Sequence, residues 1–332
     1  MFRLCSYITI GNVSMNSVHE VRVNRSIHSY IDTAKIKIPA SAYLKYSSPL
    51  PPTQSIQRPD GRYSTAYLFQ RGDQVQIQLG YDNELKTEFT GFINRINFTT
   101  PLEIECEGYS WLLRQKTINV SWKSITLKGI LQYLIQGTPI TLSQNIPEIS
   151  LNNIFFRGTT ADNVLGWIKD KLLMTIFFNG SELYAGLEFT QYKGTEKYKL
   201  GWNVIKDDNL KYHIATDTKI KIKAISISGN GSKIEAEVGD STGVTHSVYF
   251  YNEKSLAQLK ADAQKKLQHF KYDGYEGKIT AFLQPYLEHG YKVILDDPQY
   301  AERSGSYLIE GVEVSFGTSG ARRTCEIGIK VS

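Results

Sequence analysis

The side chains best suited to chemistry in this sequence are carboxylates that occur in pairs or rows. They are Asp207 with Asp208, Asp296 with Asp297, and the alternating Glu103, Glu105 and Glu107. Glycoside hydrolysis needs two carboxyl groups about 5–10 Å apart. However, glutamates that alternate along a strand are typical of its solvent-facing side, and an aspartate pair followed by proline predicts a turn. No carboxyl group stands in a setting that would raise its pKa for acid catalysis, so we expect no enzymatic activity.

Other reaction centres and cofactor sites are missing from the sequence pattern. Six histidines are scattered without an HExxH spacing, and Cys5, Cys106 and Cys325 form no CxxC pair. There is no GxSxG elbow, Walker A loop or dinucleotide-binding glycine fingerprint. We therefore expect no catalytic residue, no metal and no cofactor.

Composition and charge indicate an ordinary globular protein. The chain has 332 residues, enough for two or three domains at about 100–200 residues each. Its 38 basic and 33 acidic residues are interspersed and give a net charge of +5, which predicts a mixed solvated surface instead of a nucleic-acid-binding one. Tyr (21) and Phe (14) are plentiful and Met (3) is scarce, a balance that favours strands. No signal-peptide pattern and no apolar run of about 18 residues is present, so we expect a protein made and kept in the cytosol.

Strand patterns dominate both ends of the chain. Polar and apolar residues alternate with period two over residues 35–38, 73–79, 102–107 and 219–223. Residues 47–62 are rich in Pro, Ser and Gln, and they predict a long surface loop. This pattern indicates a β-rich α+β protein, not the βαβ alternation of a doubly wound sheet.

Three segments predict helices. Residues 126–137 begin with Thr126 as a capping residue and end at Gly137, and apolar residues recur three or four apart between them. Residues 160–173 and 253–270 show the same spacing. The turn at Asn179 and Gly180 predicts a hairpin directly after the second helix.

The two strand-rich ends resemble each other. Gly72, Val75, Gly91 and Cys106 have counterparts of similar spacing in the second half, at Gly290, Val293, Gly311 and Cys325. Gly91 and Gly311 each lie inside a strand pattern, where glycine is typical of a bulge or a sharp bend. We interpret the likeness as an internal duplication of a small barrel, at about residues 1–110 and 200–332.

The C-terminal motifs resemble those of a known family. They are Gly277-Lys278-Ile279-Thr280-Ala281-Phe282, Pro285, Gly290-Tyr291-Lys292-Val293, Tyr300-Ala301-Glu302-Arg303, Gly305-Ser306-Tyr307-Leu308-Ile309 and Gly311-Val312. The sequence is similar to the phage late control D (baseplate hub) family, which includes hub proteins of Mu-like prophages and the N-terminal half of type VI secretion spike proteins. The GD-x-V and F-x-G-x-I motifs at Gly72 and Phe89 fit the same family, so the resemblance covers most of the chain.

The resemblance implies the architecture. Two tail-tube-like antiparallel β-barrels, at residues 1–112 and 196–332, would be joined by an α+β middle domain at 113–195. We expect helix 253–270 to pack on this middle domain.

The resemblance also implies the function: a non-enzymatic baseplate hub subunit of a contractile phage tail. Three copies would form a ring that joins the six-fold tail tube to the three-fold spike. The implied partners are the chain itself as a homotrimer, the spike protein, the tail tube and other baseplate proteins. DNA would pass without specific binding, and the protein would be assembled in the host cytoplasm into the virion tail baseplate. Neither a membrane nor a small-molecule ligand is implied.

Four sets of residues are candidates for roles in such an assembly. Glu103, Glu105 and Glu107 are candidates for a lumen-facing row that repels DNA phosphates, with outward solvation as an equal alternative. Arg58 and Arg62 mark a candidate partner-contact loop. Lys219, Lys221 and Lys223 would face an acidic neighbour or protect a strand edge. Gly91 and Gly311 are expected as structural turn glycines.

Two other functions remain open from the sequence. The hub of a secretion system or of a tail-like injection particle would have the same motifs. A cell-wall-degrading tail enzyme is the alternative of another class, and the paired carboxylates are its only support.

Overall fold

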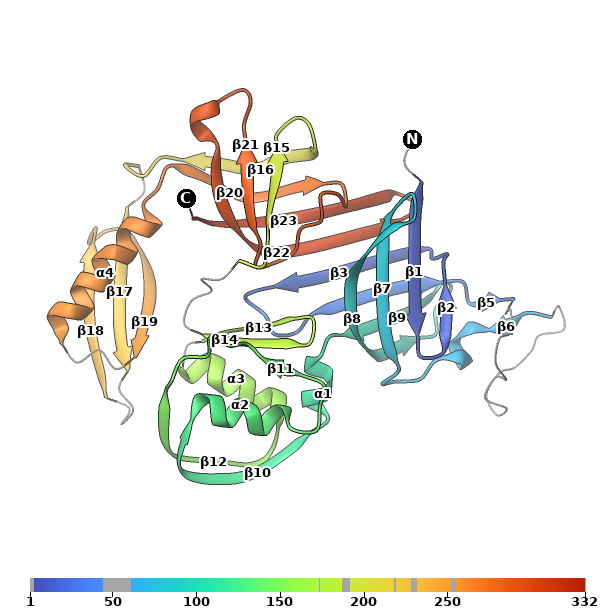
Figure 1. Ribbon diagram of the computed structural model, residues 1–332, viewed down its shortest axis with the longest axis horizontal. Helices are drawn as coiled ribbons and strands as arrows, with labels where there is room; N and C mark the ends of the chain where they lie inside the picture. The colour runs from blue at the N-terminus through green and yellow to red at the C-terminus, as the bar shows by residue number, and fades with distance from the viewer. Residues whose placement is uncertain are drawn as a thin grey trace.

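The structure is a computed structural model that describes residues 3–43, 61–172, 174–186, 192–217, 219–227, 232–251 and 255–331. It is β-rich, with a large, mainly antiparallel sheet and two smaller units of helices and strands inserted into it (Figure 1). This confirms the predicted α+β class. Within these residues no helix is long and apolar enough to cross a membrane.

The N-terminal third supplies one set of strands to the large sheet. These strands are β1 (Leu4–Ile10), β2 (Val13–Met15), β3 (Glu20–Ser26), β4 (Thr33–Ile38), β7 (Gln74–Tyr81), β8 (Glu84–Asn97) and β9 (Leu102–Glu107). Two short strands, β5 (Ser41–Ala42) and β6 (Tyr63–Ser64), pair with each other and precede a 3-10 helix, η1 (Thr65–Leu68). The predicted alternation is present: in β4 the side chains alternate between buried and partly or fully exposed.

The C-terminal third supplies a second set of strands. These are β15 (Thr195–Lys199), β16 (Val204–His213), β20 (Gly274–Ala281), β21 (Lys292–Asp296), β22 (Gly305–Gly317) and β23 (Gly320–Lys330), with a short 3-10 helix η2 (Ala301–Arg303). β22 pairs with β21 along its first residues and with β3 along its last ones, from Gly311 opposite Ser26 to Gly317 opposite Glu20. Both strand sets therefore belong to one 13-stranded sheet.

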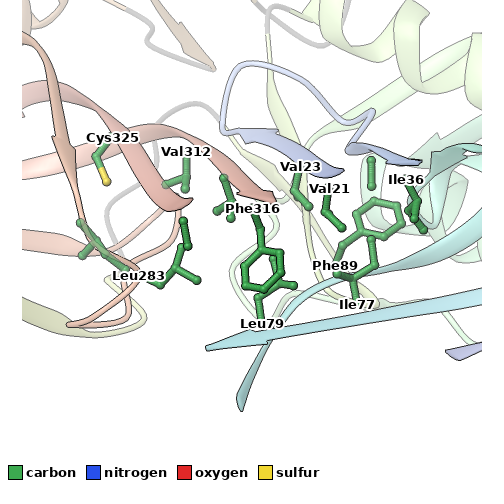
Figure 2. Close-up of a cluster of buried hydrophobic side chains, with 14 of the residues drawn as sticks. Val21, Val23, Ile36, Ile77, Leu79, Phe89, Leu283, Val312, Phe316 and Cys325 are labelled. Carbon is green, nitrogen blue, oxygen red and sulfur yellow. The ribbon is translucent and has the colours of Figure 1, made fainter. Parts of the chain in front are cut away.

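The two strand sets also share one hydrophobic core. Figure 2 shows Val21, Val23 and Ile36 of the first set in the same cluster as Val312 and Phe316 of the second. This refines the expectation of two separate barrels: the β3–β22 ladder joins them edge to edge, and apolar side chains continue across the junction.

The predicted internal likeness is present in the order of the strands. The series β8-β9-β4-β3 in the first half corresponds to β22-β23-β20-β16 in the second, and every neighbouring pair is antiparallel. Three rows of directly opposite residues match. They are Arg22, Lys35, Glu105 and Arg95 against Lys206, Thr280, Thr324 and Glu313; Val21, Ile36, Ile104 and Ile96 against Val204, Ala281, Arg323 and Val314; and Asn24, Thr33, Glu107 and Phe92 against Asn209, Lys278, Glu326 and Gly311.

A middle unit with its own core is inserted between β9 and β15. It contains α1 (Ser110–Arg114), β10 (Thr117–Thr126), α2 (Leu127–Ile135), β11 (Thr141–Leu142), β12 (Ser150–Thr160), α3 (Ala161–Leu172), β13 (Thr175–Asn179) and β14 (Glu182–Gly186). The first two predicted helices and the predicted hairpin are confirmed as α2, α3 and β13–β14. As expected, the side chain of Thr126 caps α2, accepting a hydrogen bond from the N–H of Gly129 at 3.0 Å.

A second inserted unit lies between β16 and β20 and was not foreseen as separate. It consists of β17 (Ile220–Ile227), β18 (Lys233–Gly239), β19 (Val244–Tyr251) and α4 (Leu256–Phe270), and it stands apart at the left of Figure 1. The expectation that helix 253–270 packs on the middle domain is wrong. Leu259, Ala263 and Leu267 of α4 pack instead on β17 and β18, because those strands have an apolar face of their own to cover.

Candidate functional site

Two of the three candidate lumen glutamates lie on the outer face of β9, away from the core. Glu103 and Glu105 are half-buried, and Lys35 on β4 lies between them, with its Nζ 3.1 Å from Glu103 and 3.7 Å from Glu105. The side-chain amide of Asn97 donates to both carboxylates at 3.1 Å. The hydrogen bond from Lys35 holds the pKa of Glu103 below its usual value. The face therefore carries two carboxylates whose charge is partly balanced by Lys35.

The third glutamate, Glu107, does not belong to this face. Its side chain is only 3 % exposed, accepts a hydrogen bond from the Ser110 hydroxyl at 2.7 Å and pairs with Arg114 at 2.9 Å. The strand ends here, and the carboxylate turns toward α1, where burial raises its pKa despite these partners. The expectation of one row of three glutamates is thus corrected to two, because Glu107 joins the sheet to the middle unit.

The candidate partner-contact loop is described only at its end. Arg58 and the rest of residues 47–60 lie outside the described residues. Arg62 is exposed, with its guanidinium 5.8 Å from the centre of the Tyr43 ring, and that tyrosine is itself 71 % exposed. Arginine and tyrosine beside each other on a surface are typical of residues that contact protein partners.

The two predicted turn glycines both lie inside long strands, Gly91 in β8 and Gly311 in β22. Phe92 of β8 lies opposite Glu107 of β9, and Gly311 of β22 lies opposite the matching residue of β23, Glu326. The structural counterpart of Gly311 is therefore Phe92, one residue after the predicted Gly91. A Cβ atom at Gly91 would lie 2.2 Å from the backbone oxygen of Glu107, whereas one at Gly311 would meet only the flexible Glu326 side chain at 3.0 Å. Close backbone approach therefore requires glycine at position 91 more strictly than at position 311.

Of the predicted lysine row, Lys221 and Lys223 are paired within their own sheet, whereas Lys219 is exposed directly before β17. Lys221 lies 3.2 Å from Glu237, and Lys223 lies 2.8 Å from Glu235, both across the β17–β18 ladder. The acidic neighbour of this row is thus β18 of the same chain. Such exposed pairs contribute little stability, typically below about 1 kcal/mol.

The two aspartate pairs are separate from each other and differ in role. Asp297 accepts hydrogen bonds from the Tyr275 hydroxyl and from the backbone N–H groups of Gln299 and Tyr300. Burial opposes ionisation, but these donors lower the pKa of Asp297, so the carboxylate organises the predicted turn. Asp207 is exposed on β16. Among the described residues, no group of three or more His, Cys, Asp or Glu side chains is placed to hold a metal ion.

A buried charge network lies where the two strand sets meet. Arg323 of β23 is 0 % exposed and pairs with Glu88 of β8 at 2.6 Å. Arg25 of β3 lies 3.8 Å from Glu88 and 2.8 Å from Glu288, in the connection between β20 and β21. Two guanidinium groups and two carboxylates thereby join elements of both halves.

Solvent exclusion shapes the protonation of groups around this network. Burial raises the pKa of Asp32 to about 7, although the charge of Arg25 opposes this. Burial likewise lowers the pKa of His289 to about 3, so its imidazole is neutral and pairs with the Phe178 carbonyl at 2.9 Å.

The sequence pattern already indicates that Arg323 is buried. Arg323 alternates with Ala321 and Cys325, which puts it on the inward side of its strand.

Comparison with known proteins adds the family context. No protein-family model and no curated protein sequence matches this chain. Solved structures do match: the 43 kDa tail protein of prophage MuSo2 from Shewanella oneidensis has a TM-score of 0.60 at 13% identity, over 98% of this chain and 97% of that one. A tail protein from Neisseria meningitidis MC58 gives the same score and identity, over 99% and 97%. This chain has the fold of phage tail proteins.

A type VI secretion component has the same fold. The Escherichia coli c3393 protein, described as similar to the T4 tail proteins gp27 and gp5, matches with a TM-score of 0.57 at 10% identity, over 98% of this chain and 77% of that one. The resemblance to the baseplate hub family is thus confirmed at the level of the fold. The likeness extends over the whole chain, including both inserted units.

Proposed function

We propose that this chain is a structural hub subunit of a contractile phage-tail baseplate, and that three copies form a ring between the six-fold tail tube and the three-fold spike. The observation that carries this proposal is the internal repeat. Each chain holds two β units of the same strand order joined edge to edge. Three such chains supply six similar units, which is what a three-fold ring needs to match a six-fold tube.

The fold likeness supports the proposed surroundings. Prophage tail proteins share the fold over nearly the whole chain, which supports a place in the virion tail baseplate after assembly in the host cytoplasm. The spike, the tail tube and other baseplate proteins are the proposed partners, with residues 47–62 as a contact loop. A hub of a secretion or tail-like injection particle is the second candidate, supported by the type VI component. The genes adjacent to this one would separate the two.

We also propose that Glu103 and Glu105 face the lumen of the ring. Two carboxylates near the surface at the same strand face would repel phosphates and let DNA pass without specific binding. Replacing both by lysine is expected to slow genome delivery in an infection assay. Since Lys35 lies between them, the neutral pair Glu103→Gln and Glu105→Gln serves as the control for local destabilisation, and normal delivery by the lysine variant contradicts the proposal.

A cell-wall-degrading activity finds no support in the geometry. Asp207 lies in β16, and Asp297 follows β21 and is hydrogen-bonded within its own turn. Release of peptidoglycan fragments by the purified protein would overturn the non-enzymatic proposal.

The experiment that tests the hub proposal is the solution mass by light scattering across a range of concentrations. A species of about three times 37.6 kDa is expected. A monomer at every concentration, also with the spike protein added, contradicts the ring.

A further inference from the structure

The junction inside the chain shows how two of these β units join. The end of β22 pairs antiparallel with β3, and Phe316 lies directly opposite Val21. Phe316 is 7 % exposed, and both residues belong to the shared core. An edge strand of one unit thus covers an aromatic residue at the end of a long strand of the other.

The same long strand in the first half ends with an uncovered phenylalanine. Arg95 and Ile96 of β8 take the positions that Glu313 and Val314 take in β22, because they lie opposite matching residues of β9 and β23. Continuing two residues along each strand brings Phe98 to the position of Phe316. Phe98 is 75 % exposed.

This stretch of β8 also has an open side. β7 covers β8 from Glu84 to Phe92, and the last ladder bonds on that side join Ile93 to the turn before β7. In the part of the chain that the structure describes, residues 95–98 have no strand on that side. In β22, the corresponding side is where β3 binds.

The strand that corresponds to β3 is itself an edge. Asn24, Arg22 and Val21 of β3 match Asn209, Lys206 and Val204 of β16 in the rows given above. β16 is the last strand in the sheet order, at the opposite end from β2, and among the described residues it pairs only with β20. An exposed edge strand is a template for pairing with another chain.

We propose that β16 of one copy pairs antiparallel with residues 95–98 of a second copy, the end of β8 and the residue after it, in the register that β3 uses on β22. This places Asn209 opposite Arg95 of the neighbouring copy. Because β16 has an extra residue between Lys206 and Asn209, Lys206 then lies opposite Asn97 of that copy. The contact is head-to-tail, so repeating it closes a ring if the rotation permits. The proposal rests on the proposed function and names the strands that would build its ring.

Side chains at both edges suit this pairing. Ile205 next to Val204 is 42 % exposed and would extend the apolar contact to Phe98. Arg95 is exposed on one edge and Asp207 on the other, which adds opposite charges to the ladder. The two edges therefore offer backbone hydrogen bonds, apolar area and complementary charge.

An engineered disulfide tests the register directly. Residues directly opposite in an antiparallel ladder have Cα atoms about 4.5–5.5 Å apart, within the range of a disulfide. In a Cys5→Ser background, the pair Arg95→Cys and Asn209→Cys is expected to give covalent dimers and trimers after mild oxidation. The matched control combines Asn209→Cys with Lys233→Cys, an exposed position on the separate β17–β19 sheet, and should stay uncrosslinked.

A truncation of the aromatic residue tests the energetics. Phe98→Ala is expected to raise the concentration for half-maximal association by at least about tenfold, because the burial of one phenylalanine is lost. Phe155→Ala removes an equally exposed phenylalanine from β12, 76 % exposed, and should leave association unchanged. Unaltered melting temperatures of both variants will show that the fold is intact.

The outcomes separate this proposal from the hub proposal. A trimer in light scattering without the crosslink, and without an effect of Phe98→Ala, overturns the strand pairing but leaves the ring. A monomer at every concentration, also with the spike protein added, and without crosslinks overturns both. Crosslinked trimers with a weakened Phe98→Ala variant support both.

Discussion

Four strands in each β half of this protein pair in the same antiparallel order, but the two halves differ in chemistry at one matched position. Ile104 of β9 lies in an apolar row of the first half, whereas its counterpart Arg323 of β23 is a fully buried guanidinium. Glu88, from the first half, neutralises that charge. The comparison shows that the two halves of the chain keep the same strand order, while a single inward-facing position in one half makes a contact with the other half.

The largest effect is expected from breaking this contact. Glu88→Ala leaves Arg323 buried without its carboxylate and should lower the free energy of unfolding by about 3–5 kcal/mol. Urea denaturation measures it. Glu103→Ala, which removes the surface partner of Lys35, is the control and should cost less than about 1 kcal/mol. Equal effects would mean that the buried pair does not couple the halves.

The matched phenylalanines give the second prediction. Phe316→Ala opens a cavity in the shared core and should cost about 3 kcal/mol, whereas Phe98→Ala in the monomer should change the free energy of unfolding by less than about 0.5 kcal/mol. Denaturation at a concentration where the protein is monomeric measures both. A large loss for Phe98→Ala in the monomer would show that the residue supports its own chain.

The predicted turn glycines give the smallest expected effect. Gly91→Ala forces its Cβ against the Glu107 backbone and should cost about 1–3 kcal/mol. Gly311→Ala meets only a flexible side chain and should cost less than about 1 kcal/mol. Melting temperatures of the two variants compare them, and a reversed order would contradict the close-approach argument.

Local patterns were sufficient to predict much of the framework. Period-two alternation identified strands such as β4 and β9, and the capping residue Thr126 identified the start of α2. The spacing of Cys106 and Cys325 revealed the duplication, because each cysteine lies inward on a strand at the same place in its half. These features depend on neighbours along the chain.

Features that depend on distant neighbours were not predicted. The packing partner of α4 could not be read from its apolar face, since periodicity identifies a buried side but not what covers it. Glu107 follows the alternation of Glu103 and Glu105, yet it is buried because α1 begins directly after the strand. Glu88, the carboxylate partner of Arg323, lies in the first half of the chain, so the sequence around Arg323 gives no sign of it.

The connection between β16 and β20 indicates that the unit inserted there can be replaced. β3 and β4 are joined by residues 27–32, whereas the matching strands β16 and β20 are joined by residues 214–273, which contain the β17–β19 sheet and α4. His213 and Gly274, where this insertion leaves and re-enters the sheet, lie directly opposite each other. The inserted unit therefore begins and ends at neighbouring positions of the sheet. A short loop, or another domain whose termini lie close together, could replace it at the same two residues.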